Sequence, residues 1–242
     1  MVWLKKFVPV IAAMALLLSS VAIVNADLAS PRAQWTTVRM ESETVDVVLG
    51  EKRVEVTAVF HFSNNGKADA IPMGYPLGVV ETALNDFKVF VDDKEITNVR
   101  TMDKQPDTGA RMLKEGDSNS YRFEGPYKQW KVVDVQMAEN EKKTVKVSYW
   151  VEPAQVKTAE VSNVSHYVYT LLTGATWKGK IDEAIVRVKL KDIKPANVVQ
   201  ATPGKFEKSD NDSTYTWTFK DFKPSENVEV TFKSNAETAE KK

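Results

Sequence analysis

The chain has 242 residues, with 33 basic and 33 acidic side chains, two histidines and no cysteine. The charges balance and both signs are mixed along the chain, which argues against the concentrated positive face that binds nucleic acid. The lack of cysteine excludes disulfide scaffolds, thiolate nucleophiles and cysteine-ligated zinc or iron–sulfur centres.

The N-terminal segment has the pattern of a secretory signal peptide. Lys5 and Lys6 precede a mostly apolar run over 7–24, and Ala26 is a small residue directly before the predicted cut. We therefore expect residues 1–26 to be removed and the remaining chain to be secreted or otherwise extracytoplasmic. The alternative is an uncleaved signal that anchors the protein, because the run approaches the roughly 20 apolar residues that span a bilayer. We expect no membrane span in the mature chain.

Alternating apolar and polar residues predict β-strands throughout the remaining chain. The longest example covers 54–62, where Val54, Val56, Ala58 and Phe60 share one face. Only 77–85 and 155–161 could form short helices, so the predicted class is all-β. Similar strand patterns occur at 45–49, 87–91, 145–151, 184–190, 215–219 and 228–232, with turn residues between many of them.

The number and spacing of these strands predict two antiparallel β-sandwich units of immunoglobulin-like type. The first covers 36–152, the smaller second covers 164–234, and 235–242 is a loose tail. Each unit has a tryptophan, Trp130 or Trp217, followed by a turn and a closing alternating strand. This weak internal sequence similarity favours a duplicated unit, although two similar hairpins could also arise independently.

Several motifs combine glycine, proline and tryptophan at particular spacings. They are Glu41-Ser-Glu-x-Val45-x-Val47-x-Leu49, 54–62 with Asn64-Asn-Gly66, Met73-Gly-Tyr-Pro76, and Tyr169-x-Leu171 with Thr173-Gly-Ala-x-Trp177-Lys-Gly179-x-Ile181. Together these motifs resemble a family of exported bacterial β-rich proteins of unknown function. The resemblance covers most of the chain after residue 26 and implies an extracytoplasmic β-rich protein without catalytic residues to assign.

The candidate catalytic and metal-binding residues are few. His61 and His166 lie on separate predicted strands and cannot form a metal site alone, so we expect neither a metal nor another cofactor. No Gly-x-Ser-x-Gly motif marks a serine nucleophile. Acidic residues are plentiful, but most fall in turns and on polar strand faces, where solvation explains them as well as catalysis does.

A long polar insertion over 102–121 is the candidate binding region, because long loops in compact domains are often functional. Aromatic residues follow it directly, and such rings can stack on a sugar or anchor a protein partner. The alternative is a mobile loop followed by core aromatic residues. The candidate residues are Asp103, Asp107, Asp117, Tyr121, Tyr127 and Trp130.

The sequence therefore predicts a noncatalytic binding or structural module of the bacterial cell envelope or the medium. Its expected partner is an envelope protein or a polysaccharide. Two alternatives remain open: a carboxylate-based hydrolase acting on extracellular polysaccharide, and an envelope assembly subunit with an unpaired sheet edge.

Overall fold

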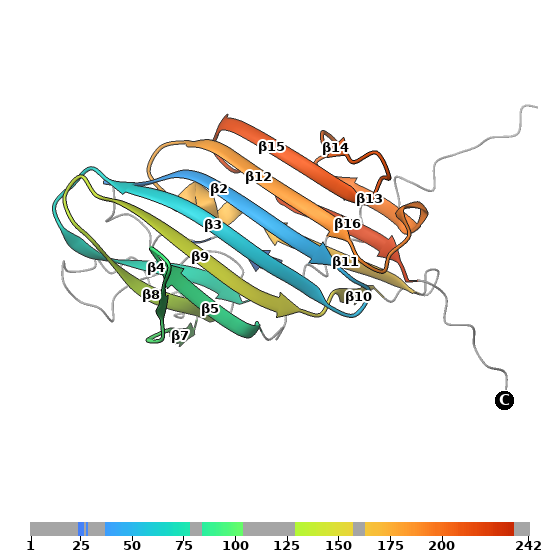
Figure 1. Ribbon diagram of the computed structural model, residues 1–242, viewed down its shortest axis with the longest axis horizontal. Helices are drawn as coiled ribbons and strands as arrows, with labels where there is room; N and C mark the ends of the chain where they lie inside the picture. Colours follow the sequence, from blue (N-terminus) through green and yellow to red (C-terminus); the bar gives the residue numbers. More distant parts are fainter. Residues whose placement is uncertain are drawn as a thin grey trace, which may run out of the picture.

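The computed structural model describes residues 24–26, 28, 37–77, 84–103, 129–156 and 163–234. Within them nearly all regular structure is β, with two short 3-10 helices, η2 (Leu172–Thr176) and η3 (Pro195–Asn197) (Figure 1). The predicted all-β class is confirmed. Residues 1–23 of the predicted signal and the predicted tail lie outside the described residues.

An eight-stranded sheet forms one layer of the molecule (Figure 1). Its pairings are antiparallel, except that β2 and β12 run parallel from Ser42↔Glu183 to Leu49↔Leu190. The spatial order is β14 (Glu207–Lys208), β15 (Thr214–Phe222), β12 (Ile181–Leu190), β2 (Val38–Leu49), β3 (Val54–Asn64), β9 (Lys142–Val151), β5 (Asn85–Val91) and β6 (Lys94–Ile96).

Two smaller sheets form a second layer against one face of this sheet. The two meet where β1 lies beside β4. One sheet has the order β1 (Val24–Ala26), β11 (Val164–Thr170), β16 (Val228–Lys233) and β13 (Val198–Thr202), with β10 (Ala154–Val156) also paired to β11; the other has the order β4 (Asp69–Leu77), β8 (Gln129–Met137) and β7 (Arg100–Asp103).

These sheets do not show two separate immunoglobulin-like units. Strands from both predicted ranges, 36–152 and 164–234, belong to the eight-stranded sheet, because β12 pairs directly with β2. The parallel pairing joins segments far apart in the sequence, and strand alternation carries no information about such a partner. The two short stretches predicted as helices also differ: Leu77, Asn85 and Gln155 lie in strands, while 78–83 and 157–162 are outside the described residues.

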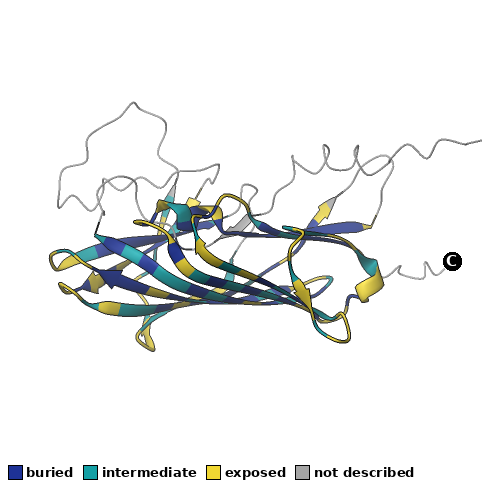
Figure 2. Ribbon diagram, turned by 90° about the horizontal axis from the view of Figure 1, so that it is seen from above, coloured by how far each residue is buried: buried dark blue, intermediate teal, exposed yellow. Residues whose placement is uncertain are grey.

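The core lies between the two layers. Along the large sheet, buried positions alternate with partly exposed ones (Figure 2), because only one face of the sheet is covered. Phe60, Phe62 and Trp217 of the large sheet are completely buried, as are Val230 and Phe232 of β16. The core therefore continues from one end of the large sheet to the other, as its connected buried side chains show.

Three buried tyrosines link all three sheets. The hydroxyl of Tyr75 on β4 donates to that of Tyr149 on β9 at 2.7 Å, and Tyr167 on β11 lies beside Tyr149. Burial raises the pKa of Tyr149 and of Tyr167 well above the usual value. The hydroxyl groups of Tyr75 and Tyr149 thus pair with each other inside the core.

Candidate binding surface

The sequence-predicted binding region is only partly described. Asp107, Asp117, Tyr121 and Tyr127 lie outside the described residues, and Asp103 is the last residue of β7. Trp130 lies on β8, where it is only 2 % exposed and pairs with Met102 of β7. Its buried ring has no free face on which a ligand could stack.

The two histidines are placed on different sheets. His61 is exposed on β3, with its Nδ1 3.1 Å from Thr144 Oγ1. His166 is buried on β11, with its Nε2 3.3 Å from Glu229 Oε2. Within the described part of the chain, no group of three or more histidine, cysteine or acidic side chains could hold a metal ion.

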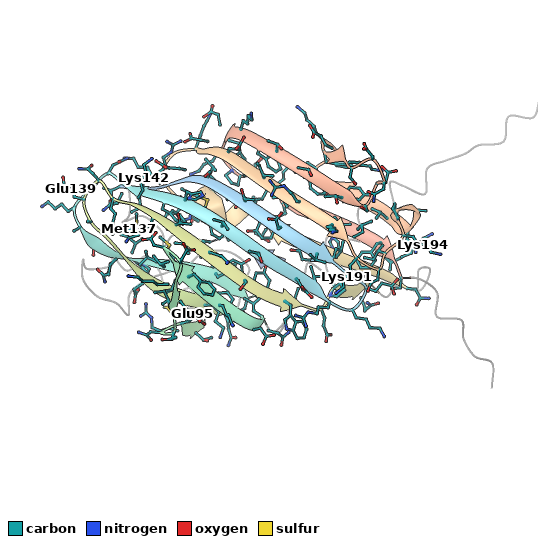
Figure 3. All side chains as sticks on the ribbon, viewed as in Figure 1. Glu95, Met137, Glu139, Lys142, Lys191 and Lys194 are labelled. Carbon is teal, nitrogen blue, oxygen red and sulfur yellow. The ribbon has the colours of Figure 1, made fainter. Side chains whose placement is uncertain are left out.

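The broadest polar surface is the uncovered face of the eight-stranded sheet, which we call the outer face. It carries the side chains of the strands that point away from the core, such as Thr57, Ser148 and Trp150. Figure 3 shows its side chains between Glu139 and Lys142 at one end of the molecule and Lys191 and Lys194 at the other. Charged and hydroxyl-bearing residues dominate this face.

Trp150 on β9 is a large aromatic side chain whose contacts hold it on the outer face. In the strand register it lies between Glu55 of β3 and Asn85 of β5. Its indole Nε1 donates to Asp86 Oδ2 at 2.8 Å, and the Arg53 guanidinium lies 4.6 Å from the ring centroid. The ring remains partly exposed, so a fixed aromatic group faces solvent.

A β-bulge explains how Asp86 reaches the indole. The register between β5 and β9 shifts between Asn85 and Lys88, and Asp86 has a φ of 53°. A side chain at such a φ is uncommon, and bulges redirect side chains next to functional sites. Here the bulge presents the Asp86 carboxylate to Trp150, while Phe87 contacts the buried Tyr75 ring at 5.6 Å between centroids.

Arg53 is held at the other side of this cluster. Its Nε lies 3.1 Å from Glu55 Oε1, and the Arg53 side chain is 51 % exposed. A guanidinium over an indole covers one face of the ring and helps to fix its orientation. We call Arg53, Glu55, Asp86 and Trp150 the Trp150 cluster.

The Trp150 cluster combines the two kinds of group that recognise hydroxyl-rich or peptide ligands. The indole and guanidinium provide a flat surface for stacking, while the two carboxylates can accept hydrogen bonds from hydroxyl or amide groups. Thr57 and Ser148 form the next row of the sheet in register, beside Lys88 of β5. Hydroxyl groups therefore continue the polar surface beyond the ring.

Carboxylates elsewhere on the sheet are paired with cations. Asp46 lies 3.1 Å from Arg187, and Glu41 lies 2.9 Å from Lys142. The hydrogen bond from Lys142 lowers the pKa of Glu41, and that from Lys143 lowers the pKa of Asp92. These environments favour the ionised form, whereas a general acid needs a raised pKa.

The Trp150 cluster was not predicted from the sequence. The alternation that places Val147, Tyr149 and Val151 in the core also places Trp150 on the polar face. A tryptophan at a solvent-facing strand position was the available signal. Its partners could not be found in the same way, because Arg53 comes from the β2–β3 turn and Asp86 depends on a bulge.

No helix in the described part of the chain is long and apolar enough to cross a membrane. No family model and no curated protein sequence matches this chain.

The chain matches several solved structures. One is a Legionella pneumophila protein described as a candidate nutrient-binding protein, with a TM-score of 0.63 and 16 % identity over 86 % of this chain and 70 % of that chain. The M1 zinc metallopeptidase of Deinococcus radiodurans matches with a TM-score of 0.40 and 10 % identity over 84 % of this chain and 43 % of that chain. The aminopeptidase A of L. pneumophila matches with a TM-score of 0.38 and 11 % identity over 85 % of this chain and 22 % of that chain. The chain thus spans less than half of either peptidase, and at 16 % identity the likeness to the first protein shows a shared fold alone.

Proposed function

We propose that the protein is an exported, noncatalytic binding module of the bacterial cell envelope or the medium, and that its ligand contacts the outer face at the Trp150 cluster. The observation that carries this proposal is the fixed, partly exposed indole of Trp150, held by Asp86 and covered by Arg53. Rigid aromatic anchors supply much of the affinity in protein recognition sites and cost little conformational entropy when they bind.

Export is part of this proposal, with a cut after Ala26. The support is the positively charged start, the apolar run and the small residue before the cut. The L. pneumophila protein described as a candidate nutrient-binding protein has the same fold, which is compatible with a binding role.

A polysaccharide is the ligand class that suits the Trp150 cluster best. Sugar rings have an apolar face that stacks on an aromatic ring, and their hydroxyl groups donate hydrogen bonds to carboxylates. Trp150, Asp86 and Glu55 offer these two kinds of contact side by side. An envelope protein is the second candidate partner, because tryptophan and arginine are also common anchors of protein interfaces.

The ion pairs on the outer face favour a binding role over the activity of a carboxylate-based hydrolase. Such an enzyme needs two carboxyl groups that converge on the substrate, one of them with a raised pKa. Glu55 faces Arg53 and Asp46 faces Arg187 on the outer face, so these carboxylates are engaged with cations instead.

The test passes the mature chain, 27–242, over arrays of bacterial cell-wall fragments and polysaccharides while sugar release is assayed in the same wells. We expect retention without cleavage, and a loss of affinity of at least about tenfold in Trp150→Ala, as for an aromatic anchor residue. Thr218→Ala is the matched control, because Thr218 is exposed on β15 of the same sheet, away from β9. Sugar release, or equal retention of both variants, would contradict the proposal.

A further inference from the structure

We propose that cleavage after Ala26 opens a strand position beside β11, and that an extended, uncharged segment of another envelope protein occupies this position in the exported protein, parallel to β11. This inference rests on the export and cleavage in the proposed function. It does not depend on the Trp150 cluster, which lies on the opposite layer.

The strand position is defined by β1. Val24, Asn25 and Ala26 pair in parallel with Val168, Tyr169 and Thr170 of β11. These three residues are the last three of the predicted signal, so a cut after Ala26 removes the whole of β1. The backbone N–H and C=O groups of Val168–Thr170 that face β1 then have no strand beside them.

Neighbouring strands do not replace β1. β16 occupies one edge of β11 along Val164–Tyr169, and β10 pairs only with Val164–His166. The other edge of β11 is therefore shared between β10 and β1. β4 also contacts β1, but it contains Pro72 and Pro76, and proline has no backbone N–H with which to pair.

The chain directly after the cut is held in place. Leu28 is 1 % exposed, and its carbonyl oxygen accepts a hydrogen bond from Trp177 Nε1 at 2.8 Å. This anchor holds Leu28, the second residue of the cleaved chain, in the core. Cleavage would therefore leave a bounded gap in a formed sheet, and an open sheet edge is a known template for a peptide strand.

The surroundings determine the chemistry of the occupant. All seven residues of β11 are buried, and the six residues from Ile71 to Pro76 of β4 are buried as well. A charged side chain brought between these strands would lose its hydration without a partner. Thr170, opposite Ala26, is completely buried and its Oγ1 has no hydrogen-bond partner, so an uncharged polar group of the incoming strand could pair there.

The first experiment compares two chains by hydrogen exchange. One is the exported protein, whose N-terminus is determined by mass spectrometry, and the other is a cytoplasmically expressed chain that retains 20–242. We expect the exported chain to begin at Asp27 and the amides of Val168–Thr170 to exchange at least tenfold faster in it than in the longer chain. Equal protection, or an exported chain that still contains Val24–Ala26, would overturn the inference.

The second experiment adds a synthetic peptide of residues 20–26 to the exported protein; with both ends blocked, this peptide carries no charge. We expect saturable binding that restores protection at Val168–Thr170, and at least tenfold weaker binding of the same peptide with Asn25→Asp, because a carboxylate would be buried. The absence of binding, equal binding of both peptides, or protection gained through self-association of the exported protein would each overturn the inference.

A Trp150→Ala variant separates this inference from the proposed ligand site. The strand position and the Trp150 cluster lie on different layers, so the variant is expected to bind the 20–26 peptide as tightly as the unaltered protein. Failure of polysaccharide binding with intact peptide binding would refute the ligand site alone. The reverse result would refute the strand position alone.

Discussion

The two layers of this protein are built from strands of different character. In the eight-stranded sheet, β3 and β12 alternate between buried and partly exposed residues. In the second layer, β11 is buried at every residue and β4 at the six consecutive residues from Ile71 to Pro76. Alternation is thus a signature of a sheet with one wet face, and it disappears where strands are covered on both sides.

The eight-stranded sheet contains strands from both predicted ranges, 36–152 and 164–234, so neither range contains the whole sheet. We expect that chains covering 27–156 and 157–242, produced separately, each fail to fold, because the cut separates β2 from β12 and both layers from their partners. Circular dichroism and cooperative thermal unfolding measure this. Two cooperatively folded fragments would instead support the two independent units predicted from the sequence.

The two faces of the large sheet should differ sharply in their tolerance of truncation. Phe60→Ala removes a completely buried ring from β3 and is expected to lower the free energy of unfolding by about 3–5 kcal/mol. Val59→Ala on the outer face of the same strand is the control, with an expected loss of about 0.5 kcal/mol. Urea titration gives both values, and similar losses would contradict the assignment of inner and outer faces.

The junction between the layers can be probed at a single hydroxyl group. Tyr149→Phe removes the hydroxyl group that accepts the hydrogen bond from Tyr75 in the core, so we expect a loss of about 1–3 kcal/mol in the free energy of unfolding. Tyr215→Phe is the matched control: Tyr215 is also buried, but on β15 away from the junction. An equal or larger effect in the control would argue against a special role of the tyrosine cluster.

The smallest expected effect concerns charges at the turns of the large sheet. Hydrogen bonds from Lys143 lower the pKa of Asp92 and of Glu141, so these groups stabilise the fold above the ordinary carboxyl pKa of about 4. That contribution is lost as the pH falls through the lowered values. We therefore expect Lys143→Met to be slightly less stable than the unaltered protein at pH 7.

The same two proteins are expected to converge in stability as the pH falls through the lowered carboxyl pKa values and both groups become protonated. Lys88→Met, at an exposed position on the neighbouring strand β5, controls for the loss of a lysine as such. Urea midpoints across the pH range measure the difference. If the difference in stability between Lys143→Met and the unaltered protein becomes larger towards low pH, the predicted direction of this pH dependence is wrong.

Parts of the fold could be predicted because local physics decides them. The strand at 54–62 follows from alternation, and the Asp92–Asp93 turn follows from two residues that tolerate positive φ, as both have here. The order of strands could not be predicted in this way. The parallel β2–β12 pairing joins distant segments, and β11 carries no alternation that would reveal its orientation.

The candidate binding surface was less accessible from the sequence than the fold. Trp130 and Trp150 both lie on strands, yet the first is buried on β8 and the second is partly exposed on β9. Trp150 could be placed on the polar face by counting from Tyr149. Its contact with Asp86 depends on a bulge and a positive φ, which no periodic pattern contains.

The most direct test of the central proposal is the affinity of the mature protein for the polysaccharide that it retains from a cell-wall array, measured by calorimetry with and without Trp150. We expect saturable binding without cleavage, a loss of affinity of at least about tenfold in Trp150→Ala, and an unchanged affinity in Thr218→Ala. Unchanged affinity in Trp150→Ala, with the variant shown to be folded, would place the ligand elsewhere and contradict the account.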